Sequence, residues 1–406
     1  MKYIDGGVCA AKGFKASGLH CGIRKNKTKR DIALILSEKI GTAAAVYTTN
    51  LVKGAPILVD QQNLANGKAQ AIICNSGNAN TCNADGIEKA IKMCKIAADQ
   101  CGILPEDVIV ASTGVIGMPL DVEPIKNSMA DLYKELDNTL ESGRNAAEAI
   151  MTTDTKLKEV AVEFEIGGVV CKMGGIAKGS GMIHPNMATM LVFITCDADI
   201  SSEMLQKALS ADVKKTFNMI SIDGDTSTND TAAIIANGMA GNKPIVSEGE
   251  DFDAFCEALR SVTMSLCKML AADGEGATKL LECNVTGGKS ECVAQTVAKS
   301  VICSSLLKAA MFGADANWGR VLCAIGYSGA DVDITKIDVA FESVKGNLPV
   351  CKNGAGIPFS EEKAKEILLE DKINILIDLN DGEAEATAFG CDLTYDYVKI
   401  NGDYRT

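Results

Sequence analysis

Stretches of consecutive apolar residues alternate with segments of helical spacing through the first half of the chain. The consecutive stretches are typical of buried strands, and they predict strands at 31–39, 41–50, 70–81 and 107–117. Apolar residues three and four positions apart predict helices at 86–102 and 121–136. Gly102 marks the end of the first helix, and Asp121 is a suitable N-cap for the second.

The second half continues this mixture and then repeats it on a smaller scale. Residues 160–200 hold two strand-like stretches around a glycine-rich loop, and the pattern beyond them predicts helices at 201–217 and 250–276 and a strand at 232–237. After residue 280 it predicts helices at 293–312 and 360–370 and strands near 333–343, 373–380 and 383–390. We therefore expect an α/β protein with a core domain at 1–280 and a smaller C-terminal α/β domain at 281–406.

Charge and histidine content exclude several classes of function. The chain carries 40 Lys and Arg against 53 Asp and Glu, and its net charge of −13 argues against nucleic acid or an anionic membrane as the main partner. It has only two histidines, His20 and His184, so a metal centre with several histidine ligands is excluded. If the chain is an enzyme, we expect its catalytic base to be another group.

The 16 cysteines are spaced as core residues usually are. No pair forms a C-x-x-C motif, and several, such as Cys196 and Cys303, stand in apolar stretches, so we interpret them as reduced thiols in a cytosolic protein without a metal site. The first residues lack the apolar region of a signal peptide, and no run approaches the roughly 20 apolar residues of a membrane span. The sequence predicts a soluble cytoplasmic protein.

The loop KGSGMIHPNMATM (178–190) is the most unusual segment of the chain. It does not fit the Walker phosphate loop, because Lys178 precedes the Gly-Ser pair, but a different glycine-rich kinase loop stays open. A second hypothesis makes Thr189 a nucleophile. If the bond before it is cut, its own α-amine, with an ordinary pKa of about 7.7–8.0, becomes the base. An ordinary connecting loop is the simplest alternative.

Two further loops carry candidate chemistry. ASTGVIG (111–117) follows a buried strand, and its backbone N–H groups with the Thr113 hydroxyl could form an oxyanion hole or simply make a strand-to-helix turn. DGDTSTND (223–230) is dense in short polar groups, which suits either Mg²⁺ or a loop that satisfies its own hydrogen bonds. Spacing alone does not decide between these readings.

Taken together, the segments resemble the ornithine acetyltransferase family, the ArgJ-type glutamate N-acetyltransferases of arginine biosynthesis. The resemblance covers essentially the whole chain and follows the family's order of motifs. The motifs are AAVYTTNLVKGAP (44–56), ICNSGNANTC (73–82), ASTGVIG (111–117), AIMTTDT (149–155), MGGIAKGSGMIHPNMATML (173–191), FNMISIDGDTSTNDT (217–231), DGEGATK (273–279), NWGR (317–320) and NGDYRT (401–406). One departure is Ala316, where many relatives have proline.

The resemblance implies a precursor that cuts itself between Ala188 and Thr189. The products, an α chain (1–188) and a β chain (189–406), would stay together, usually as an α₂β₂ heterotetramer. The implied fold has stacked sheets flanked by helices, with a self-processing N-terminal-nucleophile-like (DmpA/ArgJ-like) core. The implied reaction moves acetyl from N-acetylornithine to glutamate through an acetyl-threonine, with ping-pong kinetics and no cofactor. Some members also use acetyl-CoA as donor, and the sequence does not decide this point.

The resemblance also assigns roles to single residues. Thr189 matches the nucleophile, and Thr113 with Gly114 matches the oxyanion-hole pair. The substrate-contacting positions are matched by Thr152, Lys178, Thr189, Glu275, Asn401 and Thr406. Three alternatives remain beside this reading: an amidase or aminopeptidase in which water resolves the acyl-enzyme, an ATP-dependent kinase, and a non-catalytic amino-acid-binding protein.

Overall fold

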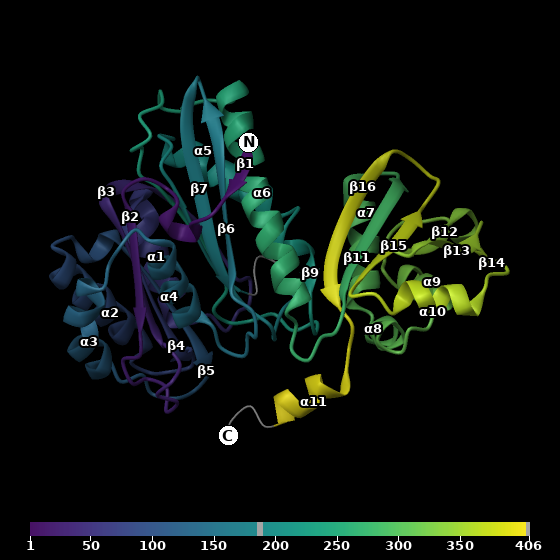
Figure 1. Cartoon of the computed structure of the whole chain (residues 1–406), viewed down its shortest axis with the longest axis horizontal. Coiled ribbons are helices and arrows are strands. Elements are labelled where there is room, and N and C mark those ends of the chain that lie inside the picture. The colour runs from purple at the N-terminus through teal and green to yellow at the C-terminus, as the bar shows by residue number, and fades with distance from the viewer. Residues whose placement is uncertain (185–189, 403–406) are drawn as a thin grey trace. The chain divides into compact units, whose positions relative to one another are not determined.

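The computed structural model describes residues 1–184 and 190–402, which form two compact units (Figure 1). Unit 1 takes residues 1–179, 186–217 and 226–266 of the chain, and unit 2 takes 180–185, 218–225 and 267–406. Residue 280, near which we expected the domain boundary, lies inside unit 2, where it begins strand β11. Helix α6 (Glu250–Ala272) runs across the division between residues 266 and 267.

Unit 1 is built on a nine-stranded mixed sheet with the order β1-β6-β7-β8-β10-β3-β4-β5, in which β2 also pairs with β3. The β4–β5 and β8–β10 pairs are parallel, and the other pairs are antiparallel. The strands are β1 (Lys2–Ile4), β2 (Phe14–Leu19), β3 (Ile32–Tyr47), β4 (Lys68–Asn78), β5 (Val108–Val115), β6 (Lys158–Ile166), β7 (Val169–Lys178), β8 (Leu191–Cys196) and β10 (Thr231–Ala236). Residues 160–200 thus hold parts of three strands instead of the expected two.

Strand β3 joins the two strands that we expected at 31–39 and 41–50 into one strand of 16 residues. Its first part pairs with β2, and its second part pairs with β10. The register with β4 shifts between Leu36 and Gly41. A Cβ on Gly41 would lie 2.5 Å from the carbonyl oxygen of Ala236, so the glycine lets β10 approach the bend closely.

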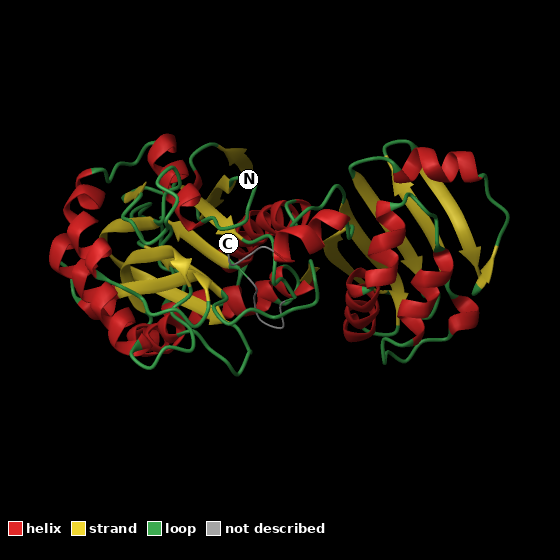
Figure 2. Ribbon diagram, turned by 90° about the horizontal axis from the view of Figure 1, so that it is seen from below, coloured by secondary structure: helices red, strands yellow, loops and turns green. Residues whose placement is uncertain are grey.

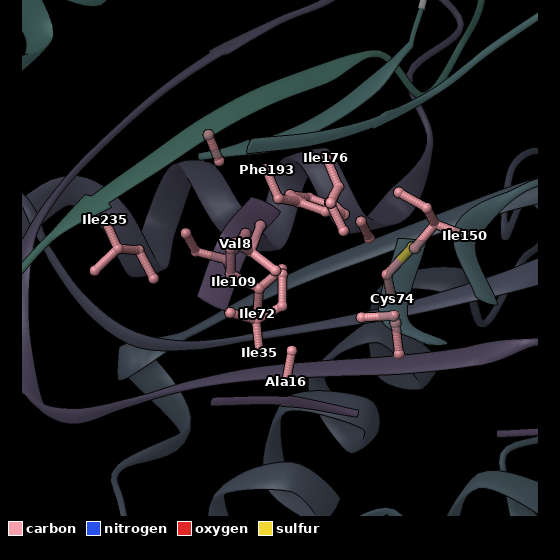
Figure 3. Packing of buried hydrophobic residues seen from close by; sticks show 14 of the residues in the cluster. Val8, Ala16, Ile35, Ile72, Cys74, Ile109, Ile150, Ile176, Phe193 and Ile235 are labelled. Carbon is pink, nitrogen blue, oxygen red and sulfur yellow. The ribbon is translucent and has the colours of Figure 1, made fainter. Parts of the chain in front are cut away.

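Consecutive apolar residues are needed in this sheet because both of its faces are buried. Ile73 on β4 packs with Leu34 in a core cluster that includes side chains of α1 (Ala55–Asn63), α2 (Gly86–Cys101) and α3 (Glu123–Lys134). The neighbouring residues Ile72 and Ile35 point into the opposite cluster. That second cluster unites α4 (Leu140–Ile150) with side chains from both halves of the sheet, as Figure 3 shows for Ile176 and Phe193 above Ile72 and Ile35.

Two helices of unit 1 begin at side chains that accept hydrogen bonds from their first N–H groups. The side chain of Thr139 accepts from Ser142 N at the start of α4, and that of Ser201 accepts from Met204 N at the start of α5 (Ser202–Val213). The N-cap position of α3 lies one residue after Asp121, which we expected to occupy it. Val122 occupies the N-cap position, while Asp121 Oδ1 accepts from Glu123 N at 3.0 Å.

Unit 2 is an α/β unit with a seven-stranded sheet of order β14-β13-β12-β15-β11-β16-β9. Its strands are β9 (Ile220–Ser221), β11 (Leu280–Gly288), β12 (Asp338–Ser343), β13 (Gly346–Lys352), β14 (Ala355–Gly356), β15 (Lys372–Asp378) and β16 (Ala384–Cys391). Its helices are α7 (Glu291–Cys303), α8 (Ser305–Phe312), α9 (Trp318–Gly326), α10 (Glu361–Leu368) and α11 (Tyr395–Gly402). The single helix expected at 293–312 is two helices, because Ser304 leaves the helical conformation (ψ 107°) and caps α8 through Leu307 N.

Helices cover one face of this sheet (Figure 2). The alternation in β15 reflects this arrangement, since Ile373, Ile375 and Ile377 are buried while the residues between them are partly exposed. Within residues 1–184 and 190–402, no helix is both long and apolar enough to cross a membrane.

Candidate active site

The parallel strands β4 and β5 pair two glycines, Gly77 and Gly114, with each other near their ends. Gly114 has a φ of +130°, and a Cβ on it would lie 2.4 Å from the carbonyl carbon of Gly77. No other residue fits there without moving the backbone. The glycine of the expected oxyanion loop is therefore required by the geometry at the end of β5.

Thr113, the residue before this glycine, is in contact with Lys178 at the end of β7. Lys178 Nζ donates a hydrogen bond to Thr113 Oγ1 at 3.3 Å, although the two residues are 65 positions apart. The lysine side chain is almost wholly buried, and burial lowers its pKa, against the opposing charges of Asp154 and Asp230. The structure thus brings two of the predicted site residues together.

Asp154 is the centre of the polar groups around Thr152. Its carboxylate accepts hydrogen bonds from Thr152 N (3.0 Å), Gly179 N (2.7 Å) and the ammonium of Lys158 (2.7 Å). Both side chains of the Asp154–Lys158 ion pair are fully buried. Burial alone would raise the pKa of Asp154, but the charges of Lys178 and Lys158 and the Gly179 N–H outweigh it and lower the pKa to about 2.

The segment before Thr152 is fixed to the end of β4. Ser76 Oγ donates to the carbonyl of Ala149 at 2.6 Å. The Arg24 guanidinium donates to the carbonyl of Ser76 at 3.2 Å and also to the carbonyl of Met151. Thr152, Thr113 and Gly114 consequently belong to one hydrogen-bonded framework in unit 1.

Residues 226–230 of the polar loop belong to unit 1, and their side chains form hydrogen bonds to β5 and to the residues that follow β4. Asn229 Nδ2 donates to the carbonyls of Ala79 (2.6 Å) and Ser112 (3.0 Å), and its Oδ1 accepts from Thr81 Oγ1 at 2.6 Å. Thr228 Oγ1 donates to the same amide oxygen. These contacts fit the reading of a loop that satisfies its own polar groups. No cluster of three or more metal-ligating side chains occurs among residues 1–184 and 190–402.

In unit 2, Glu275 and Asn401 are paired. Asn401 Nδ2, on α11, donates to Glu275 Oε2 at 2.7 Å. Glu275 is 8% exposed, and its backbone N–H donates to the carbonyl of Ser180 at 2.8 Å. A Cβ on Gly181 would lie 2.3 Å from Glu275 Oε2, so this glycine makes room for the carboxylate.

Asp223 binds the backbone of the two residues that follow Gly181. Its carboxylate accepts from the backbone N–H groups of Met182 (2.6 Å) and Ile183 (2.9 Å) and from the hydroxyl of Tyr397 (3.2 Å). Tyr397 lies on α11, the helix that carries Asn401. The carboxylate thereby links the loop at 180–184 to the C-terminal helix within unit 2.

His184 lies against a hydroxyl and a thiol. Its Nδ1 is 3.1 Å from Ser221 Oγ and 3.3 Å from Cys303 Sγ. Burial and the nearby Lys299 ammonium lower the pKa of His184 to about 4, so the ring is neutral at physiological pH. All 16 cysteines are free thiols, and nine of them are buried.

Three residues of the predicted site, Ala188, Thr189 and Thr406, lie outside the described residues. Sequence reasoning missed Asp154, Lys158 and Asp230, all of which are buried near Lys178. Asp154 and Asp230 stand inside two of the quoted motifs, AIMTTDT and DTSTND, which was the available signal. Lys158 had no such signal, because it follows its motif and begins β6.

Comparisons with known proteins identify the family. The ArgJ family model matches residues 15–406. "Arginine biosynthesis bifunctional protein ArgJ" of Caldanaerobacter subterraneus is 51% identical over 407 residues, covering all of both chains, and "Glutamate N-acetyltransferase" of Methanocaldococcus jannaschii is 46% identical over 418 residues, also covering all of both. A crystal structure of arginine biosynthesis bifunctional protein ArgJ from Bacillus halodurans is 47% identical with a TM-score of 0.51, and the match covers 53% of this chain and 99% of that one. The chain belongs to the ArgJ family.

Proposed function

We propose that this chain is a glutamate N-acetyltransferase of arginine biosynthesis that moves acetyl from N-acetylornithine to glutamate. The observation that carries the proposal is the partly buried contact between Lys178 and Thr113 beside Gly114, in a member of the ArgJ family. The names of its relatives, glutamate N-acetyltransferase and arginine biosynthesis bifunctional protein, support the reaction class. The free thiols and the acidic composition suit a cytoplasmic enzyme.

Thr189 is the nucleophile in this proposal. Self-cleavage between Ala188 and Thr189 frees an α-amine, which takes the proton of the Thr189 hydroxyl as Oγ attacks the acetyl carbonyl. Ornithine leaves, and the amine of glutamate then attacks the acetyl-threonine ester. The match to the Bacillus halodurans chain supports the cut. It covers 53% of this chain, which is close to the share of the β chain, 218 of 406 residues.

Thr113 and Gly114 stabilise the oxyanion. An ammonium can only donate, so the Lys178–Thr113 bond uses an oxygen lone pair of Thr113 and leaves the hydroxyl proton available for another acceptor. That proton, with the backbone at Gly114, is suited to the negative charge that develops on the acetyl oxygen. Loss of one such donor typically lowers kcat by about 10²–10³-fold.

Each unit offers one buried charge to a charged group of a substrate. In unit 1 the Lys178 ammonium is a partner for a carboxylate. In unit 2 the Glu275 carboxylate, oriented by Asn401, is a partner for an ammonium. We assign Thr152 and Thr406 to the same substrate contacts. No step of this mechanism needs a metal or an organic cofactor.

Acetyl-CoA is a second donor in this proposal, because the word "bifunctional" in the relatives' names supports a second activity. The α and β chains stay together after the cut, and we propose an α₂β₂ assembly. Size-exclusion chromatography with light scattering measures that assembly directly.

The test is made with purified enzyme. Incubation with N-acetylornithine and glutamate should give equal amounts of ornithine and N-acetylglutamate, and a denaturing gel with intact-mass analysis should show two fragments, the second beginning at Thr189. Thr189→Ala should remain uncut and inactive, whereas Thr189→Ser keeps a hydroxyl and should retain partial cleavage. Ornithine without acetylglutamate would indicate an amidase instead, and an active enzyme of one uncut chain would refute the nucleophile assignment.

A further inference from the structure

The C-terminal helix α11 belongs to unit 2 but buries little apolar surface there. None of its eight residues is buried, and two of its apolar side chains are largely exposed, Tyr395 at 85% and Val398 at 71%. A helix of this length is marginal in water unless tertiary contacts stabilise it. The position of α11 therefore depends on a small number of polar contacts.

Two contacts hold the start of α11 beside Glu275. Thr394, the residue before the helix, donates from Oγ1 to the carbonyl of Gly276 at 2.7 Å. A Cβ on Gly276 would lie 2.8 Å from Tyr397 N, so the glycine lets the helix approach closely. Both contacts involve Gly276, the residue that follows Glu275 in the chain.

Tyr397 supplies a third contact through its side chain. Its hydroxyl donates to Asp223 Oδ2 at 3.2 Å, and burial and the Asp223 charge raise the pKa of Tyr397, so the hydroxyl keeps its proton. The Asp223 carboxylate also accepts from the backbone N–H groups of Met182, Ile183 and Asp225. These backbone bonds fix the carboxylate, which gives the tyrosine a charged acceptor in a defined position.

Tyr397 is also joined to the two unit 2 residues that we assign to substrate contacts. Asn401 Nδ2 donates to the carbonyl of Tyr397 at 3.0 Å and to Glu275 Oε2 at 2.7 Å. Tyr397 therefore contacts Asp223 through its hydroxyl and Asn401 through its carbonyl. If the hydroxyl contact is lost, the helix can move together with Asn401, and Glu275 loses the donor that orients it.

We propose that Tyr397 is a positioning residue, whose hydrogen bond to Asp223 docks α11 and so holds the Asn401 amide against the Glu275 carboxylate. The consequence for the substrate rests on the proposed function, because Glu275 is a partner for a substrate ammonium only in that mechanism. The docking of the helix does not depend on the reaction. Tyr397 acts through Asn401 and Glu275 and needs no contact with the substrate.

The test removes one hydroxyl, with Tyr397→Phe. Hydrogen–deuterium exchange with mass spectrometry follows the amides of α11, which we expect to exchange about tenfold faster because a hydrogen bond to a charged acceptor is lost. KM for N-acetylornithine should rise about fivefold to tenfold while kcat changes less than about twofold. This split is expected because Glu275 is assigned to the substrate ammonium and not to the reacting acetyl group.

The matched control is Tyr395→Phe, the same change two residues earlier in the same helix. Tyr395 is 85% exposed, and its edge-to-face contact with the Phe312 ring does not involve the hydroxyl. The exchange of α11 and the KM of this variant should equal those of the wild type. If Tyr397→Phe does not fold while Tyr395→Phe does, Tyr397 is a structural residue and the proposal is wrong.

A second variant, Asp223→Asn, shows whether Tyr397 acts through Asp223. In that background Tyr397→Phe should raise KM by a smaller factor than it does in the wild type, and an equal factor would overturn the proposal. Unchanged exchange of α11 in folded Tyr397→Phe, or faster exchange with an unchanged KM, would overturn it too. The exchange needs no turnover, so a wild-type enzyme without acetyl transfer but with faster α11 exchange in Tyr397→Phe would refute the proposed function and leave the docking role standing.

Discussion

The fully buried ion pair between Asp154 and Lys158 makes Asp154→Asn the sharpest test of how this site is held together. The substitution keeps the side-chain shape and one acceptor oxygen but removes the charge. The Lys158 ammonium, with no exposed side-chain surface, would then lose the charge of Asp154. Gly179 N and Thr152 N would compete for the remaining oxygen, so the framework around Thr152 should also loosen.

The magnitude follows from two independent estimates. Removal of one partner of a buried ion pair typically costs about 3–5 kcal/mol. The fall in the pKa of Asp154 from 3.8 to about 2 corresponds to about 2 kcal/mol of stability at neutral pH. We therefore expect the free energy of unfolding to drop by about 3 kcal/mol.

The pH dependence has a definite sign. A carboxylate whose pKa is depressed in the folded state stabilises the fold above its unfolded pKa, and this stability is lost as the pH falls through the folded value. The difference between wild type and Asp154→Asn should be constant from pH 5 to 8 and should shrink between about pH 4 and pH 2. Urea unfolding followed by circular dichroism measures it at each pH.

A double-mutant cycle with Lys158→Met isolates the pair. We expect a coupling of about 2 kcal/mol or more, with the double variant more stable than the sum of the single losses predicts. Asp121→Asn, at a more exposed carboxylate that accepts from Glu123 N, is the control and should change stability by less than about 0.5 kcal/mol. Additive single losses, or a difference that persists undiminished at pH 2, would refute the reasoning.

Two further predictions concern glycines of the site. In Gly114→Ala the new Cβ would meet the Gly77 carbonyl carbon at 2.4 Å with φ at +130°, so the melting temperature should fall by an amount equivalent to about 2–4 kcal/mol and acetyl transfer should be lost. Gly117→Ala, which meets nothing within 4 Å, is its control for thermal unfolding and should lose less. In Gly181→Ala the Cβ would meet Glu275 Oε2 at 2.3 Å and displace the carboxylate, which should raise KM for N-acetylornithine about tenfold, and an unchanged KM would argue against a substrate contact by Glu275.

The sequence predicts the elements of unit 1 correctly where either a continuous apolar run or helical spacing is clear. The apolar runs of β4 and β5 and the spacing of α2 are correctly predicted within about three residues at each end, because both faces of these strands are buried and α2 has a distinct apolar side. The sequence analysis did not predict helix α4, since its buried side consists mainly of small residues, with Ile150 as its only large apolar side chain. The sequence on both sides of Ser304 is apolar and predicts one continuous helix. The break between α7 and α8 becomes clear only from the structure, where the Ser304 side chain caps α8.

The site shows a similar limit. Thr113, Gly114 and Lys178 were predicted from motifs, and the structure places them in one framework. The carboxylates that stabilise Lys178 could not be assigned from sequence, because their role depends on burial and on a register between strands far apart in the chain. Spacing shows that Asp154 and Lys158 are four residues apart, but it does not show that both are buried.

The order of strands in unit 1 has a consequence for a chain that is cut before β8. The sheet runs β7-β8-β10-β3, so a cut between residues 188 and 189 would assign β7 and β3 to one polypeptide and the two strands between them to the other. The fragment that begins at residue 189 would then fill the interior of the other fragment's sheet, with hydrogen bonds on both outer edges of the inserted pair. The two chains would behave as a split protein that assembles only once, while still covalently continuous, and whose halves cannot exchange with those of another molecule without unfolding.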